Sequence, residues 1–228
     1  MKTIKIILVL TGIICFAISG HSQNINWQSL KKEQKHIFSL STGYEYGAVF
    51  GAAYSHQLKT KYPMLLNIEY SFPAGKTVFD DFKTKLGVQF RLLKIDNFCL
   101  SAKANGVIRR FDDPLVRIFN FGSDFSTAVG YYKTKWFVAG EAGFDKAIET
   151  HFKHTNLFKE YYAGVKDGWY TPATGGNFYY GLQGGFSFKN ADITIKGGKV
   201  ITQDFRTNPL IPFYAQLGLN LRLSSFNK

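Results

Sequence analysis

The chain has 228 residues, of which 17% are aromatic, and it carries a formal charge of +12. The length fits one domain or a single barrel, and no apolar run of about 18 residues follows the N-terminus, which excludes a transmembrane helix there. The positive charge does not indicate nucleic-acid binding, because the basic residues are not clustered with exposed aromatic residues as such a groove requires. A high aromatic content without a long apolar run is typical of a β-barrel with aromatic girdles.

Residues 1–22 are predicted to be a secretory signal peptide. Lys2 and Lys5 form its basic start, an apolar stretch follows, and small residues precede a cut before Gln23. A small residue followed by Gln at the cut resembles signal peptides of the Bacteroidota. Removal of the two lysines lowers the formal charge from +12 to +10. Only Cys99 then remains, so the mature chain cannot form an internal disulfide.

Residues 23–36 form a short lead before the first predicted strand. This lead contains Trp27, Leu30 and a basic run of Lys31, Lys32 and Lys35. We expect it to be a disordered tail in the periplasm, with a short interfacial helix as the alternative.

Ten segments alternate apolar and polar residues with the two-residue period of a β-strand. One side of each is apolar and the other polar or charged, which fits lipid outside and water or ion pairs inside. A soluble antiparallel sheet can show the same pattern, but the signal peptide and the repetition favour lipid. The predicted strands span residues 37–46, 48–58, 64–72, 82–92, 98–110, 116–131, 136–145, 178–188, 192–200 and 211–223.

The last segment, residues 211–223, has the clearest pattern. Thirteen residues exceed the roughly 9–11 that a tilted strand needs to cross a bilayer. We expect this strand to close the barrel against residues 37–46 and to be the segment that the barrel-assembly machinery reads. Its polar side ends in Arg222, and its lipid-facing side includes Phe213, Leu217, Leu219, Leu221 and Leu223.

The connections between the predicted strands alternate in length. Those after the second, fourth, sixth and eighth strands are short. Those after the third, fifth, seventh and ninth are longer or irregular, the longest being residues 146–175, and only the first outer turn, near Gly47, is tight. Short periplasmic turns and longer outer loops give this asymmetry, and an even strand number places both termini in the periplasm. The predicted fold is therefore all-β: a transmembrane antiparallel up-and-down barrel of about ten strands within residues 37–228. Eight strands is the alternative, if the first two merge or the ninth is lost.

This pattern resembles the small single-chain outer-membrane β-barrel proteins of the OmpA/OmpX and OmpW type, and the small barrels of Bacteroidota. The resemblance covers about residues 37–223 and rests on pattern and topology, so it transfers no functional residue. It implies the outer membrane of a Gram-negative bacterium, with membrane lipid and anionic lipopolysaccharide as the surroundings of the basic chain.

The charged residues at inward positions are the candidate site. A ten-stranded barrel should be only slightly wider than eight-stranded ones, whose interiors side chains just fill. We therefore favour a lumen closed by ion pairs, with a narrow, mildly anion-preferring channel as the alternative, because bases outnumber acids seven to five. The predicted lumen-lining charges are Glu45, Glu69, Lys83, Lys85, Arg91, Lys103, Arg109, Asp124, Glu141, Asp145, Lys196 and Arg222.

The long loop contains His151 and His154, whose spacing could place two metal ligands on one face of a helix. No third ligand has recognisable spacing, so neither a metal nor another cofactor is expected. The favoured interpretation is a solvated loop helix that packs over the barrel mouth through its apolar residues, which are Ile148, Phe152, Phe158 and Tyr162.

Acidic pairs are expected on the outer rim, at Asp80–Asp81 and Asp112–Asp113. Omptin-type outer-membrane proteases place acids and a His at the rim, and Asp80, Asp81, His151 and Asp167 would be the candidates here. None of the local motifs of that family is present, so no enzyme is expected. The favoured function is a structural or surface-interaction role or a narrow passive pore. An accessory role in a secretion or assembly complex and a rim hydrolase are the alternatives.

Overall fold

The computed structural model describes residues 24–45, 47–74, 80–173, 175–207 and 209–224. The predicted signal peptide and Tyr46 lie outside this part of the chain. Among the described residues, no helix has the length and apolarity needed to cross a membrane.

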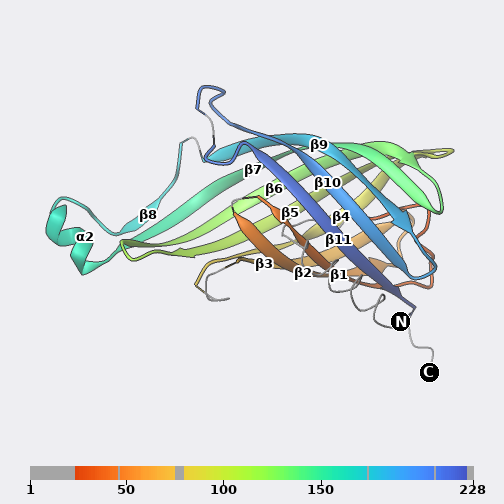
Figure 1. Ribbon diagram of the computed structural model, residues 1–228, viewed down its shortest axis with the longest axis horizontal. Coiled ribbons are helices and arrows are strands. Elements are labelled where there is room, and N and C mark those ends of the chain that lie inside the picture. Colours follow the sequence, from red (N-terminus) through yellow and green to blue (C-terminus); the bar gives the residue numbers. More distant parts are fainter. Residues whose placement is uncertain (1–23, 46, 75–79, 174, 208, 225–228) are drawn as a thin grey trace, which may run out of the picture.

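Ten long strands form a closed antiparallel barrel, in which each strand pairs with its neighbours in sequence (Figure 1). The first and last strands pair from His36 with Leu223 to Tyr44 with Ala215, which closes the sheet. The ten strands are β1 (His36–Tyr44), β2 (Ala48–Leu58), β3 (Met64–Pro73), β4 (Phe82–Ile95), β5 (Phe98–Asp112), β6 (Val116–Tyr132), β7 (Trp136–His154), β9 (Gly176–Ser187), β10 (Ala191–Thr202) and β11 (Phe213–Leu223).

The predicted fold class and the strand count of ten are confirmed, and the eight-strand alternative is wrong. The closing role predicted for the last strand is also confirmed, although β11 begins at Phe213 rather than at residue 211. The chain is thus a small single-chain antiparallel barrel.

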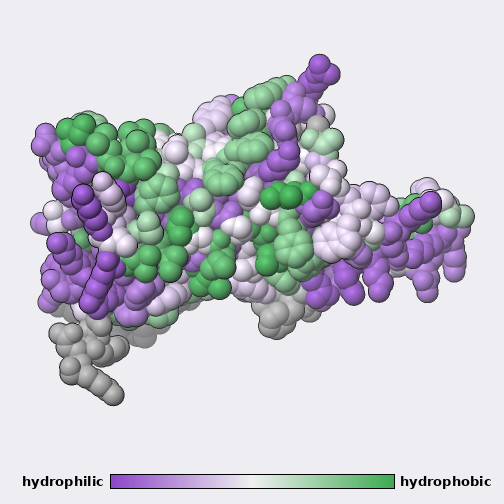
Figure 2. Space-filling view, turned by 180° about the vertical axis from the view of Figure 1, so that it is seen from behind, coloured by the Kyte–Doolittle hydropathy of each residue, from purple (hydrophilic) through white to green (hydrophobic). Residues whose placement is uncertain are grey.

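The outer wall of the barrel is apolar. Leu40, Leu86 and Leu182 each expose more than 60% of their surface, at 62%, 65% and 67%. The residues that alternate with these leucines along the same strands are buried or partly buried, and most of them are polar. Figure 2 shows hydrophobic side chains spread over the barrel wall and hydrophilic ones along a projecting part of the molecule. An apolar exterior around a polar interior is the organisation that lipid requires of a spanning barrel.

The two ends of the barrel differ. At the terminal end, where β1 begins and β11 ends, the connections between strands are short, as predicted; those between β6 and β7 and between β9 and β10 have three residues each. At the opposite end, here called the loop end, β7 extends beyond β9 while it stays paired with β6, and these residues form an arm (residues 116–122 and 147–170). The arm also carries helix α2 (Asn156–Tyr161) and the short strand β8 (Gly168–Tyr170), and it projects far from the barrel (Figure 1).

The prediction of one long loop over residues 146–175 is wrong in its first part. Strand β7 continues to His154, because its residues pair with β6 as far as Val116. A bulge interrupts the pairing where Phe121 faces Glu149 and Gly122 faces Ala147, so that Ile148 is the extra residue. A bulge reverses which side chains point inward, and this shift obscures the alternation in the sequence.

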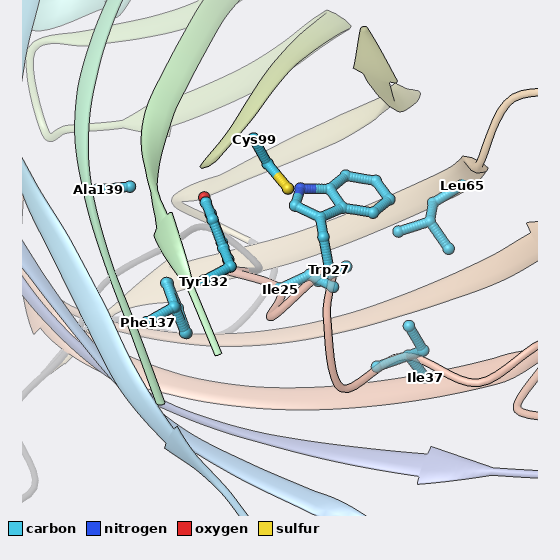
Figure 3. Close-up of a cluster of buried hydrophobic side chains, with 8 residues drawn as sticks. All are labelled: Ile25, Trp27, Ile37, Leu65, Cys99, Tyr132, Phe137 and Ala139. Carbon is cyan, nitrogen blue, oxygen red and sulfur yellow. The ribbon is translucent and has the colours of Figure 1, made fainter. Parts of the chain in front are cut away.

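The expected disordered tail is also wrong, because the lead turns back into the terminal end of the barrel. Residues 24–27 are buried, and Trp27 exposes only 3% of its surface. Figure 3 shows Trp27 inside the ring of strands, beside Cys99 and Leu65. We call residues 24–34 the plug.

Candidate functional site

A layer of ion pairs crosses the middle of the lumen. Lys83 Nζ lies 2.8 Å from Glu45 Oε1 and 3.8 Å from Asp145 Oδ2. Lys103 forms an ion pair with Glu69, and both side chains are almost fully buried. Charges removed from bulk water in this way need partners of opposite sign, and here the partners come from strands on several sides of the barrel and from the β1–β2 turn.

Two carboxylates of this layer also accept hydrogen bonds from tyrosines. Asp124 lies 2.7 Å from Lys85 Nζ and accepts a 2.7 Å hydrogen bond from the Tyr179 hydroxyl. Glu141 lies 3.3 Å from Lys196 Nζ and accepts a 2.6 Å bond from the hydroxyl of Tyr214. Each carboxylate is therefore held by a cation and by a neutral donor.

Glycines in the wall make room for the two tyrosines. A Cβ on Gly143 would lie 2.3 Å from Cζ of Tyr179, and one on Gly181 would lie 2.6 Å from the Tyr214 hydroxyl. Such distances are shorter than van der Waals contact, so any side chain here would displace the rings. The glycines of β7 and β9 thus allow the tyrosine hydroxyls to reach the ion-pair layer.

Above this layer the lumen opens towards the loop end in a cavity of about 380 Å³. A second cavity of about 420 Å³ lies against the inner side of the arm and shares Lys83, Arg109, Phe111, Asp145 and Asn177 with the first. We call the two together the cup. Its size is within the range of small-ligand sites.

Below the layer, the lumen narrows sharply. A cavity of only about 20 Å³ touches Lys103, Ser126 and Glu141, which also line the cup, and it is bounded by Asn24 of the plug. That volume holds about one water molecule. The lumen is therefore a polar path that ends on the plug.

Hydrogen bonds of side chains connect the plug to the barrel. Asn26 donates to the carbonyl of Lys133 at 2.8 Å and to the Ser187 hydroxyl at 2.9 Å. Asn220 of β11 donates to the Asn24 carbonyl at 2.7 Å. The contacts join the plug to the β6–β7 turn and to the last strands of the barrel.

Arg222 is the central anchor of the plug. Its Nη1 donates to the carbonyl and the hydroxyl of Ser29, at 2.6 and 2.9 Å. Its Nη2 donates to the Phe188 carbonyl at 2.7 Å and lies 3.1 Å from Asp192. Arg222 and Asp192 each expose 1% of their surface, so this ion pair is sealed from solvent.

The structure places the predicted lumen charges at three levels. Arg222 lies at the terminal end, Glu69 lies in the ion-pair layer, and Arg91 faces Ser101 in the part of β4 that runs towards the terminal end. The other nine line the cup: Glu45, Lys83, Lys85, Lys103, Arg109, Asp124, Glu141, Asp145 and Lys196.

Two sets of residues were missed by the sequence analysis. Asp192 shares its strand side with Lys196, so the alternation of β10 contained the signal that places it inside. The polar residues of the plug, such as Asn26 and Ser29, carry no periodic signal, because the segment is neither strand nor helix.

The histidine prediction is wrong in its geometry. His151 and His154 lie on strand β7, where residues three apart point to opposite sides. His154 lies 3.0 Å from Asp167, and the His151 ring lies 5.0 Å from that of Trp169. The described part of the chain contains no cluster of three or more His, Cys, Asp or Glu residues suited to a metal ion.

The loop helix is also not where we expected it. Ile148 and Phe152 belong to β7, and α2 lies at the tip of the arm rather than over the barrel mouth (Figure 1). Lys159 and His154 both bind the Asp167 carboxylate beside α2, in an arrangement that we call the clasp. Lys159 Nζ lies 2.6 Å from Asp167 Oδ2, and the backbone N–H of His154 donates to Asp167 Oδ1. Hydrogen bonds from Lys159 and then from His154 hold the pKa of Asp167 well below its usual range.

The rim acids have partners of their own. Asp80 lies 3.7 Å from Arg110, which also binds Asp112 at 3.0 Å, and Arg117 lies 2.8 Å from Asp112. Asp80 thus bonds to β5, whereas Asp167 is bound within the arm. Of the four hydrolase candidates, Asp80, His151 and Asp167 thus contact different residues.

No protein-family model and no curated protein matches the chain. Among solved structures it is similar to the KdgM porin, with a TM-score of 0.41 and 8% identity over 82% of this chain and 99% of the porin. The KdgM porin in complex with disordered oligogalacturonate gives 0.38 and 8% over 83% and 99%. LpxR from Salmonella typhimurium gives 0.37 and 9% over 90% and 80%. None of these likenesses transfers a residue, a ligand or an activity.

Proposed function

We propose that this protein is an integral outer-membrane barrel of a Gram-negative bacterium, without enzymatic activity, that is closed to solutes and presents a charged cup at the cell surface. One observation carries the proposal: the plug fills the terminal end of the lumen, while the cup opens at the other end. A passive pore needs a continuous water path, and here the cavity beside Asn24 has a volume of only about 20 Å³.

The asymmetry of the barrel supports its orientation. All connections at the terminal end are short, whereas the loop end carries the longer ones, which follow β3, β7 and β10, and this difference matches the periplasmic and outer sides of bacterial barrels. Both termini then lie in the periplasm, and the arm stands outside the cell. Lipopolysaccharide surrounds the barrel in this leaflet, and the exposed Arg117 and Lys153 of the arm are suited to its phosphates.

The chemistry of the cup favours interaction over catalysis. Lys85, Lys103 and Lys196 each neutralise a carboxylate, and Tyr179 and Tyr214 occupy further acceptor positions. A general acid or base must be able to exchange a proton with a substrate, and carboxylates held in this way are poorly suited to do so. We therefore assign the cup to the recognition of small polar molecules or surface components.

An accessory role in an envelope complex is the second candidate. Its support is that Lys31 and Lys32, next to the buried part of the plug, are exposed at the terminal end. These lysines would face a periplasmic partner. Crosslinking in native membranes tests this role, and recovery of the barrel without a stoichiometric partner contradicts it.

Planar-bilayer recording of the purified, folded chain tests the main proposal. We expect no unitary conductance steps, because the plug blocks the lumen. A heat-dependent gel shift verifies that the barrel is folded, and a known porin reconstituted in the same way verifies the detection of steps. Regular steps from the intact chain would refute the closed state.

A further inference from the structure

We propose that the plug gates a latent pore: when residues 24–34 leave the barrel, small ions cross the lumen. This inference rests on the proposed closed barrel, and it adds a transport activity that the intact conformation hides. Three features of the described residues support it: the wall behind the plug, the way the plug is held, and the path above it.

The wall behind the plug combines four large side chains that pack on the plug, Ile37, Leu65, Tyr132 and Phe137, with several small ones. Ser39, Ser55, Ser101 and Ser187 are all buried there, together with Cys99 and Ala139. In a barrel of this size, larger inward side chains fill the interior unaided. Here the space left by the small residues is occupied by Ile25 and Trp27 of the plug (Figure 3). Withdrawal of the plug therefore leaves an opening that is lined by these serines and by the apolar residues of the cluster.

The plug is held without joining the sheet. Its backbone hydrogen bonds are local, such as those from Ser29 and Leu30 to the Asn26 carbonyl. Its bonds to the barrel come from side chains, chiefly Asn26, Asn220 and Arg222. The sheet remains fully paired without it, because the plug contributes no strand. The plug can therefore leave without breaking the barrel.

The path above the plug is narrow but polar. The ion-pair layer is held by long lysine side chains, and the Lys83 ammonium lies 2.8 and 3.8 Å from two carboxylates, Glu45 and Asp145, so it can move from one to the other without losing its partner. Adding Asp192 to the predicted set gives seven bases and six acids along the lumen. Because these charges are almost balanced, we expect the opened pore to prefer anions only weakly. This preference is weaker than the one that the seven bases and five acids of the predicted set indicated.

The decisive experiment records single channels from the chain lacking residues 24–34, in potassium chloride. We expect unitary steps that the intact chain does not show. Lys31→Ala/Lys32→Ala is the matched control, because it changes exposed residues of the plug and leaves its buried contacts, and it should stay silent. A synthetic peptide of residues 24–36 should abolish the steps when added on the periplasmic side and have no effect from the other side.

A second variant keeps the whole chain. Asn26→Cys/Ser187→Cys in a Cys99→Ala background joins two side chains that are in hydrogen-bond contact. When Arg222→Met is added to this variant, we expect conductance steps under reducing conditions. Oxidation joins the two introduced cysteines and should abolish the steps. Silence of both the shortened chain and the reduced variant, with the barrel folded by gel shift, would overturn the latent pore. Steps from the intact chain would instead refute the closed state on which it rests.

Discussion

Replacement of Arg222 by Met should release the plug. The change keeps much of the side-chain volume but removes the charge that faces Asp192 at 3.1 Å and the donors to Ser29 and Phe188. Because Asp192 exposes only 1% of its surface, its charge stays buried without its cation. Removal of one partner from a buried ion pair typically costs about 3–5 kcal/mol. This cost corresponds to a roughly 10²- to several 10³-fold rise in the undocked population.

Trp27 makes this release measurable. The protein has three tryptophans, and Trp136 and Trp169 expose 38% and 54% of their surface, against 3% for Trp27. In a Trp136→Phe/Trp169→Phe background, Trp27 alone reports the plug. We expect Arg222→Met to shift its emission to the red, to increase quenching by acrylamide added to the water, and to lower the urea midpoint of this signal.

A double-mutant cycle separates the ion pair from general damage. Asp192→Asn removes the buried charge, so Arg222→Met should cost less in that background than in the unmodified chain. Residues in direct contact usually show coupling energies of about 0.5–3 kcal/mol. If the two changes were additive within about 0.5 kcal/mol, the ion pair would not contribute to holding the plug, and if Trp27 remained protected in Arg222→Met, Arg222 would not be the anchor of the plug.

Three further predictions concern the wall, the arm and the closing strand. Gly143→Ala should destabilise the barrel by about 1–3 kcal/mol in urea unfolding, because its Cβ would lie 2.3 Å from Tyr179. Gly140→Ala is the control, since its nearest neighbour would be 4.0 Å away, and equal effects of the two changes would contradict the packing argument. Because the pKa of Asp167 is lowered by Lys159 and His154, its clasp stabilises the arm above the ordinary aspartate pKa of about 3.9 and is lost as the pH falls through the lower, folded-state value. Limited proteolysis at residues 155–167 should therefore be unchanged between pH 7 and pH 5 and faster in Asp167→Asn, whereas protection lost already at pH 5 would argue against the clasp. Serine at Leu219, Leu221 and Leu223 should prevent membrane insertion, since each change removes roughly 1.5–3 kcal/mol of apolar burial. Leu210→Ser, in an exposed loop position, should insert normally in the same heat-shift assay.

The fold was predictable because lipid and lumen impose opposite chemistry on alternate residues. In β11 the leucines at 217, 219, 221 and 223 face outward, and Gln216, Asn220 and Arg222 face inward, as their order in the sequence indicates. The alternation of apolar and polar residues fails where the strand no longer lies between lipid and lumen. The end of β7 lies beyond its pairing with β9, where it pairs with β6 and briefly with β8, and it contains a bulge, so its last nine residues were mistaken for a loop.

The candidate site was only partly predictable for a related reason. Strand period shows that Lys85 and Asp124 point inward, but their contact at 2.7 Å depends on the register of β4, β5 and β6, which the sequence does not specify. The plug gives no periodic signal at all. Its presence could have been inferred only indirectly, from the small residues such as Ser55 and Ala139 that leave the terminal end of the lumen unfilled.

The position of the plug's partners also implies an order of assembly. Asn220 and Arg222 lie on β11, Asp192 on β10 and Ser187 on β9, so the plug's binding site is completed by the last strands of the chain. The plug precedes β1 in sequence and is therefore made first, yet it has no complete site until β11 pairs with β1. Closure of the wall and closure of the lumen thus depend on the same strand, whose leucines face lipid and whose polar residues hold the plug. A barrel in which β11 failed to pair with β1 would have an open wall and an incomplete binding site for the plug.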